Sequence, residues 1–323
     1  MNVIENVFPP FKPNEEHLQK ERIQTQISQI LAKHLPQDAT INSQIDNLVL
    51  ARSSHAKPPL HMIHHPSLCI IVQGAKDMII AEKTYRYDQD SFLLITQTLP
   101  AAGIILDATE EKPYLGMLFR LDRQEVADIA LAVQIEHSYK MSFGTKEQQQ
   151  TSVFACEHSL ELLEAIYRLV KLLDAPHDIE FMAPVIKREI IYRLLRSSAG
   201  PILAQMAIFD SHSNRISKVI SLIRQRFNEP LTLADLANHA HMSISSLQHH
   251  FKAITQISPL QFQKQIRLHE ARRIMMTEFV DAATAGLRVG YNNQSQFSRE
   301  YRRLFGSPPS TDIKKLKNNN KAV

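Results

Sequence analysis

Residues 230–252 read Pro-Leu-Thr-Leu-Ala-Asp-Leu-Ala-Asn-His-Ala-His-Met-Ser-Ile-Ser-Ser-Leu-Gln-His-His-Phe-Lys, and they decide the fold of the C-terminal third. Thr232 is a favourable N-cap, and Asp235 at the third helical position nearly matches a capping box for a short helix ending near His239. Ser243 caps a second helix, residues 244–254. Two short helices joined by a tight turn, with polar side chains outward on the second, are typical of a helix-turn-helix.

The same pattern occurs again farther along the chain. Asp281 is placed to cap a helix over residues 282–288, residues 289–291 form the turn, and Asn293 caps residues 294–305. The side chains expected to point inward from this last helix are Phe297, Tyr301, Leu304 and Phe305. Two such patterns in one chain indicate a helix-turn-helix protein far more specifically than one pattern does.

One long helix, residues 259–278, is predicted between the two units. Ser258 is an N-cap, and proline follows it at the first helical position, where the missing N–H costs no hydrogen bond.

The net charge of +4 is unevenly distributed. Residues 214–323 carry 17 Lys and Arg against 7 Asp and Glu, a net charge of +10, whereas residues 1–213 carry 20 against 26, a net charge of −6. A basic third joined to an acidic body indicates a module that binds a polyanion, and DNA is the partner favoured here. The alternative is that Lys and Arg only solvate helix faces.

The N-terminal two-thirds combines short strands with helices. A helix is expected over residues 15–35, ended by Pro36. Short β-branched or alternating runs predict a small barrel or sandwich with strands at residues 67–73, 78–81, 84–87, 91–96 and 114–121. Amphipathic helices follow at residues 157–174 and 184–197, and they either form a dimer seam or pack within the chain.

Composition narrows the class of protein. With 323 residues the chain holds two or three domains, and Cys69 and Cys156 are too few for a disulfide framework. No apolar run approaches 18 residues and the N-terminus lacks signal-peptide features, so a cytoplasmic protein without a membrane span is expected. The sequence shows no glycine-rich phosphate loop, Cys-x-x-Cys pair or nucleophile elbow, which argues against an enzyme and against a cofactor.

Residues 214–316 resemble the DNA-binding domain of the AraC/XylS transcription regulators. The resemblance rests on the segments 230–237, 242–252, 258–263, 267–273 and 289–306, the last reading Val-Gly-Tyr-Asn-Asn-Gln-Ser-Gln-Phe-Ser-Arg-Glu-Tyr-Arg-Arg-Leu-Phe-Gly. Helix 282–288 departs from the family pattern, because small residues and Gly286 stand where larger aliphatics are usual. Such a helix is either weaker or packed closer to its neighbour.

Residues 44–200 resemble the N-terminal domain of an AraC subgroup, through the segments 66–76, 85–88 and 188–195. The resemblance implies a cupin-like barrel followed by helices. We therefore predict an α+β protein with two domains. Residues 1–210 form a cupin-like β-barrel with flanking helices, which takes up an effector or mediates dimerisation. Residues 211–323 form an all-α DNA-binding domain with two helix-turn-helix units.

Positions that match the DNA-binding domain of the AraC/XylS family suggest which residues contact DNA. The residues expected to read base edges are Ser245, Gln248, His249, Gln294, Ser295, Gln296, Ser298 and Arg299. Arginine binds guanine and glutamine binds adenine through two hydrogen bonds each, while serine contacts either. Lys252, Arg302 and Arg303 are expected to hold phosphates.

The barrel interior is the candidate site for a small effector. The residues proposed to line it are Tyr85, Tyr87, Phe92, Thr96, Met117 and Phe119, together with Cys69, Ile71 and Leu94. Alternation alone leaves open which face points inward, and a filled barrel core is the competing interpretation. Cys69 is interpreted as a buried, inert thiol.

No metal is expected. His55, His61, His64 and His65 cluster near the first strands, but residues 61–65 read as a loop without the spacing that a cupin metal site needs.

The sequence thus predicts a transcription regulator that binds double-stranded DNA, responds to a small molecule or to homodimer formation, and contacts RNA polymerase if it activates. One alternative is a cupin-type metalloenzyme carrying a DNA-binding appendage. Another is a DNA-repair methyltransferase, which needs an activated cysteine that neither Cys69 nor Cys156 offers.

Overall fold

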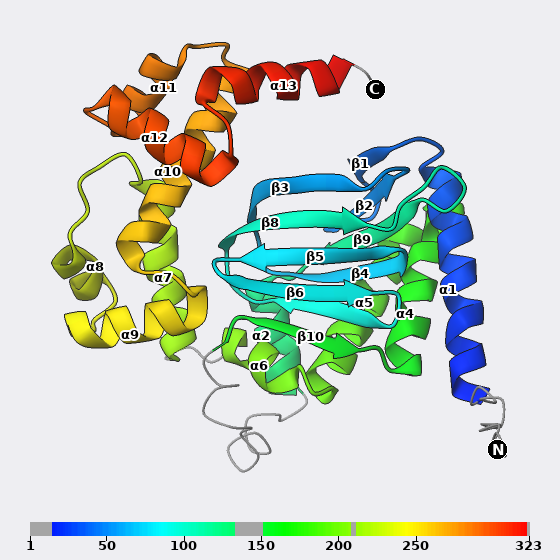
Figure 1. Ribbon diagram of the computed structural model, residues 1–323. Helices are drawn as coiled ribbons and strands as arrows, with labels where there is room; N and C mark the ends of the chain where they lie inside the picture. Colours follow the sequence, from blue (N-terminus) through cyan, green and yellow to red (C-terminus); the bar gives the residue numbers. More distant parts are fainter. Residues whose placement is uncertain (1–14, 133–150, 208–210, 322–323) are drawn as a thin grey trace, which may run out of the picture.

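A computed structural model describes residues 15–132, 151–207 and 211–321. Two antiparallel sheets with helices packed on one side form the N-terminal part, and a bundle of helices forms the C-terminal part (Figure 1). This confirms the α+β fold. Among the residues described, no helix combines the length and apolar composition needed to cross a membrane.

The first sheet has the strand order β1-β2-β9-β4-β7-β10, and the second has the order β3-β8-β5-β6. The strands of the first are β1 (Ala39–Asn42), β2 (Leu48–Ser53), β9 (Tyr114–Arg120), β4 (Ser67–Gln73), β7 (Ser91–Ile95) and β10 (Val153–Glu157). Those of the second are β3 (Lys57–His64), β8 (Leu99–Leu106), β5 (Ala75–Ile80) and β6 (Lys83–Asp88).

The loop predicted for residues 61–65 is wrong, because His61 to His64 belong to strand β3. From His61 opposite Ala102 to His64 opposite Leu99, each residue pairs with β8. The prolines Pro58 and Pro59 precede this run, and the register shifts between Lys57 and Leu60. Prolines and an irregular register hide a strand from pattern analysis, because both break the regular ladder.

The first sheet separates two hydrophobic cores, one on each face. Alternating residues of β4 divide between them, so that Leu68 and Ile70 face the helices while Cys69 and Ile71 face the second sheet. The helices that cover the outer face, or connect its parts, are α1 (Glu15–His34), α2 (Arg123–Ala132), α4 (Leu160–Lys171), α5 (Ile179–Arg196) and α6 (Gly200–Ala207). The short 3-10 turns η2 (Leu172–Asp174) and η3 (Pro176–Asp178) join α4 to α5.

Helix α5 begins at Ile179, before the predicted start at Pro184, and it contains that proline. Ile166 of α4 and Ile190 of α5 are each only 1% exposed and belong to the core between the helices and the first sheet. Of the two alternatives for these amphipathic stripes, packing within the chain is therefore correct.

The C-terminal helices follow the predicted pattern. They are α7 (His212–Gln225), α8 (Leu233–His239), α9 (Ile244–Thr255), α10 (Pro259–Thr277), α11 (Ala282–Arg288), α12 (Gln294–Phe305) and α13 (Pro309–Lys321). Thr232, Ser243, Ser258, Asp281 and Asn293 all cap as expected, and Thr232 with Asp235 forms a complete capping box. Helix α13 was not anticipated.

The two helix-turn-helix units differ in their cores. The buried residues of α7, α8 and α9 belong to the same cluster as the residues between the two sheets. The buried residues of α11 and α12 form a separate cluster with the second half of α10 and with α13. Gly286 of α11 packs against Phe297 of α12, with 3.1 Å between the position of a Cβ and the ring. The small residues of α11 therefore permit a close approach.

Candidate nucleic-acid interface

Helix α9 presents a polar face to solvent because its apolar residues are used for packing. Leu247, Phe251 and Ile254 are buried against α7 and α8. The candidate reading residues Ser245, Gln248 and His249 are exposed, and so is the candidate phosphate ligand Lys252. The side chain of Ser245 lies 3.2 Å from the Ser243 hydroxyl at the helix N-cap.

Helix α12 repeats this arrangement with a more basic outer face. Phe297 and Tyr301 are fully buried. The exposed candidates are Gln294, Ser295, Gln296, Arg299, Arg302 and Arg303, while Ser298 is half-buried. The Gln296 amide donates a hydrogen bond to Glu300 at 3.3 Å, which orients this glutamine along the helix.

Arg267 of α10 joins the two units. Its guanidinium donates to the carbonyl oxygens of Phe227 at 2.6 Å and Glu229 at 2.9 Å, both in the loop before α8. It also donates to the carbonyl oxygen of Gly290 at 3.1 Å, in the turn of the second unit. Gln263, one helical turn earlier, donates to the same two oxygens of the first unit. The planar guanidinium has several donors in fixed directions, which suits it to holding two loops at once.

The turn of the second unit lies directly against the loop of the first. Gly290 has a φ of +88°, and a Cβ at this position would collide with the carbonyl oxygen of Asn228. Only glycine combines this backbone conformation with such a close contact. The two reading helices are therefore fixed relative to one another by a backbone contact as well as by Arg267.

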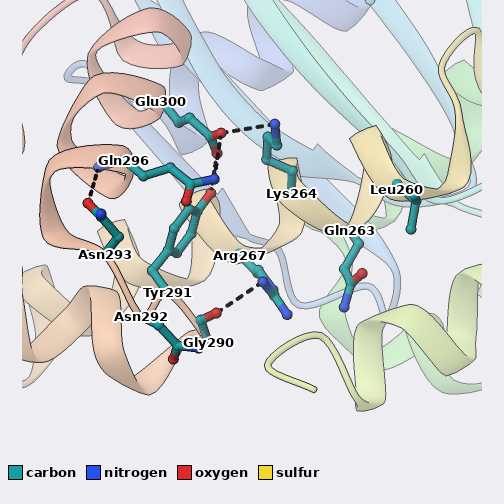
Figure 2. A pocket seen from close by; sticks show the side chains of 10 residues that line it. All are labelled: Leu260, Gln263, Lys264, Arg267, Gly290, Tyr291, Asn292, Asn293, Gln296 and Glu300. Carbon is teal, nitrogen blue, oxygen red and sulfur yellow. Dashed lines mark hydrogen bonds and ion pairs between the residues drawn. The ribbon is translucent and has the colours of Figure 1, made fainter. Parts of the chain in front are cut away.

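A polar pocket lies between α10 and α12 at this junction (Figure 2). Glu300 accepts hydrogen bonds from Tyr291 at 2.8 Å and from Gln296, and it forms an ion pair with Lys264 at 3.0 Å. Burial and the Glu300 carboxylate raise the pKa of Tyr291, so its hydroxyl stays protonated and donates. Glu300 thus ties α12 to the connecting helix.

Several contacts join the barrel to the DNA-binding helices. The Gln97 amide donates to Ser213 Oγ at 2.8 Å, and the Ser152 hydroxyl donates to the Ile254 carbonyl at 2.6 Å. On the second unit, the ring of His61 meets Phe305 edge-on at 5.4 Å between centroids. The first unit is thus held at the start of α7 and at the end of α9, its reading helix.

The β5–β6 turn of the barrel reaches the groove between the two units. Ala81 and Glu82 line one pocket together with Lys252 of α9, and Arg303 of α12 lines the same pocket. A carboxylate of the N-terminal part thus lies near two of the three candidate phosphate ligands.

The structure corrects the predicted effector lining. Phe92, Met117 and Phe119 are buried in the core beneath the helices, because each pairs in register with Leu68 or Ile70 on the outer face of the first sheet. Leu94 lies on that same face. The space between the sheets is instead lined by the alternate residues, including Leu93 and Ile95, together with the predicted Cys69, Ile71, Tyr85 and Tyr87. Thr96 follows β7 and donates to the Ser152 carbonyl at 3.3 Å.

The four histidines near the first strands do not converge. His61 points to the second unit and His64 is buried between the sheets, where desolvation lowers its pKa to about 4. Over the described ranges 15–132, 151–207 and 211–321, no group of three or more His, Cys, Asp or Glu side chains is placed to hold a metal ion.

One residue now stands out that the sequence did not indicate. Arg267 lies within a segment that carries the family resemblance, but nothing in the pattern shows that it spans two loops 23 and 40 residues away.

Comparison with known proteins supports this picture. A family model for the AraC-type transcriptional regulator N-terminus matches residues 44–202, and one for a helix-turn-helix domain matches residues 236–315. A sheet-containing N-terminal part of this type followed by two linked helix-turn-helix units defines an AraC-type transcriptional regulator. The chain belongs to the AraC/XylS family.

Individual relatives are distant. The regulator ArgR of Pseudomonas aeruginosa is 26% identical over 144 residues, which are 45% of this chain and 44% of ArgR. The arabinose operon regulatory protein of Escherichia coli is 30% identical over 98 residues, 30% of this chain and 34% of that protein. The chain thus spans less than half the length of these curated relatives.

Among solved structures, ToxT from Vibrio cholerae has the same fold. One crystal form gives a TM-score of 0.55 with 12% identity, covering 82% of this chain and 97% of ToxT. A ToxT structure with a bound unsaturated fatty acid gives a TM-score of 0.52 with 10% identity, covering 84% of this chain and 97% of ToxT.

Proposed function

We propose that this chain is a sequence-specific DNA-binding transcription regulator without catalytic activity. The observation that carries the proposal is the pair of exposed polar helices, α9 and α12, held at one fixed separation by α10. Base reading falls to Ser245, Gln248 and His249 on the first helix and to Gln294, Ser295, Gln296, Ser298 and Arg299 on the second. Lys252, Arg302 and Arg303 bind phosphates.

Salt dependence tests this function directly. Neutralising three phosphates releases their counterions, so the affinity of the full chain for DNA should fall about 40-fold between roughly 50 and 200 mM salt. The measurement is fluorescence anisotropy with a labelled duplex. Replacing Lys252, Arg302 and Arg303 with alanine should flatten the slope, whereas Lys171→Ala on the far helix α4 should leave it unchanged. A flat salt response of the unaltered chain would contradict the proposal.

The N-terminal part, residues 1–210 in our proposed division, takes up a small effector between its two sheets and passes the signal to residues 211–323. Two observations support this: the fold shared with ToxT, and the core that the space between the sheets shares with the first helix-turn-helix unit. The protein acts in the cytoplasm, where it meets DNA, and as an activator it would contact RNA polymerase. Elemental analysis of the purified chain tests the competing metalloenzyme, which requires bound metal.

We also propose that the chain forms a homodimer. The surface proposed for it differs from the helix stripes of residues 157–174 and 184–197 that the sequence suggested. Ile166 and Ile190 are buried within the chain, so charge at these positions should unfold it. The opposite face of α5 exposes apolar side chains, namely Phe181, Met182, Val185 and Tyr192.

Val185→Asp is expected to shift the chain from dimer to monomer in sedimentation at tens of micromolar while leaving the melting temperature nearly unchanged, because Val185 is 59% exposed. Leu18→Asp, at a 41% exposed position on α1, is the matched control and should not dissociate the dimer. An unaltered chain that sediments as a monomer at this concentration would exclude the dimer.

A further inference from the structure

A largely buried carboxylate lies beside the candidate base-reading residues of helix α12. The side chain of Glu300 is only 12% exposed. Its Oε2 accepts a hydrogen bond from the Tyr291 hydroxyl at 2.8 Å, and its Oε1 pairs with Lys264 Nζ at 3.0 Å. Tyr291 lies in the turn before α12 and Lys264 lies on α10, so two other segments of the chain fix the Glu300 side chain in place (Figure 2).

This carboxylate is ionised at neutral pH. Burial alone would raise the pKa of Glu300, but the hydrogen bonds from its three donors lower it. An ionised carboxylate on a helix that meets DNA opposes binding, because it repels the phosphates. Lys264 offsets part of this repulsion. A carboxylate at this place therefore calls for a compensating gain, and its third donor indicates what the gain is.

The third donor is Gln296, one of the candidate base-reading residues. Its Nε2 donates to Glu300 Oε1 at 3.3 Å, across one turn of the helix. An ionised carboxylate only accepts hydrogen bonds, so the Gln296 amide must turn its nitrogen, and not its oxygen, toward Glu300. Figure 2 shows this orientation. Of its two amide orientations, Gln296 is thus held in one.

The amide orientation decides which bases a glutamine recognises. A free glutamine turns over about its last torsion and offers either its donor or its acceptor to a base. With the nitrogen of Gln296 directed at Glu300, the acceptor Oε1 is left to meet the DNA. Adenine and cytosine each carry an amino group that donates in the major groove, whereas guanine and thymine offer only acceptors there.

We propose that Glu300 is a positioning residue that fixes the amide of Gln296, so that α12 selects adenine or cytosine over guanine or thymine at one base of its site. Glu300 does not touch the base. It acts through Gln296, and Tyr291 and Lys264 hold it in place. This role rests on the proposed DNA-binding function and names the class of base that the second reading helix recognises.

The first reading helix provides an internal comparison. Gln248 of α9 is also exposed, but the residue four positions farther along is Lys252, where α12 has Glu300. A lysine only donates hydrogen bonds, so it does not hold an amide nitrogen. The base contacted by Gln248 is therefore expected to be insensitive to substitution of Glu300.

The test uses the full chain and a bound DNA site in which each base is replaced in turn by the other three. Competition binding with Gln296→Ala first identifies the base that depends on Gln296. At that base the unaltered chain should favour adenine or cytosine by about fivefold or more. Glu300→Gln should reduce this preference to about twofold or less, because a neutral amide both donates and accepts and lets Gln296 turn over.

Three further measurements separate positioning from a structural role. Glu300→Gln should leave discrimination at the other bases intact, and its affinity for random DNA should not fall, because a negative charge is removed. Glu270→Gln is the matched control, since it removes an acid of α10 that pairs with Arg273, and it should retain the preference. Tyr291→Phe removes one of the three donors and should lower the preference partly; it serves if Glu300→Gln does not fold.

Three results would overturn the role given to Glu300. One is that no base depends on Gln296, or that the preferred base is guanine or thymine. Another is that Glu300→Gln keeps the preference. The third is a uniform loss of affinity for specific and random DNA with a lower melting temperature, which would mean that Glu300 only ties α12 to α10. An unaltered chain that binds no DNA would instead overturn the proposed function itself, and this role with it.

Discussion

Arg267→Ala is expected to reduce the affinity for a DNA site with two adjacent segments by about 100-fold or more, while affinity for either segment alone changes little. Two linked modules gain this factor from the high effective concentration of the second, and the gain disappears when their geometry is lost. Arg267 supplies three hydrogen bonds that hold the loop of the first unit and the turn of the second. Without it, the Gly290 carbonyl oxygen loses its hydrogen-bond donor on α10.

A spacing experiment separates this positioning role from general destabilisation. Each base pair inserted between the segments rotates them by about 35° relative to one another, so the unaltered chain should bind spaced sites poorly. Arg267→Ala should bind all spacings with similar, weak affinity. Arg273→Ala is the matched control, since this exposed arginine of the same helix pairs locally with Glu270 at 2.6 Å. A variant that keeps the original preference for one spacing would refute the role given to Arg267.

Arg299→Ala is expected to cost about 1–3 kcal/mol of binding to the specific site, a loss of roughly 5-fold to 150-fold, and to relax discrimination at one base pair. Arg299 is exposed on the outer face of α12, whose inner face is fixed by Phe297 and Tyr301. The measurement compares all four bases at each position of the bound site by competition binding.

Arg303→Ala provides the contrast, because a phosphate ligand contributes equally to every sequence. It should weaken specific and random DNA alike and reduce the salt slope by about one. If Arg299→Ala also weakens both kinds of DNA equally, Arg299 is a phosphate ligand and not a base-reading residue. Unchanged circular dichroism of both variants establishes that the fold is intact.

The DNA-binding helices were predictable because their determinants are local. The N-terminal ends of α8, α9, α11 and α12 are each marked by a capping side chain that binds an amide three residues farther along. The start of each helix is therefore specified by residues within one helical turn. Helix α13 begins at Pro309, and its position is set by residues distant in the sequence. Its Asp312 is fixed by Arg272 through two hydrogen bonds of 2.8 and 2.9 Å and by the Tyr301 hydroxyl, all distant in sequence.

The barrel was predictable as a class but not in detail. The first sheet is buried on both faces, so Leu68 to Val72 form an unbroken apolar run that does not show which side faces the second sheet. The prediction that Phe92, Met117 and Phe119 face the space between the sheets was therefore wrong. The face is set by pairing with Leu68 and Ile70, which are distant in the sequence. The role of Arg267 was missed for the same reason, because its hydrogen-bond partners Phe227 and Gly290 are 40 and 23 residues away in the sequence.

The single core that includes both the space between the sheets and the first helix-turn-helix unit has a consequence for how such genes recombine. An exchange that joined a foreign N-terminal part at residues 208–210 would change the residues that share a core with Ile216, Val219 and Leu247. The second unit has its own core with α13, but a crossover within α10 would break the junction that Arg267 and Gly290 form with the first unit. Exchange of the N-terminal part thus disturbs the core of the first unit, and exchange of the second unit disturbs the contacts that fix the two reading helices relative to one another.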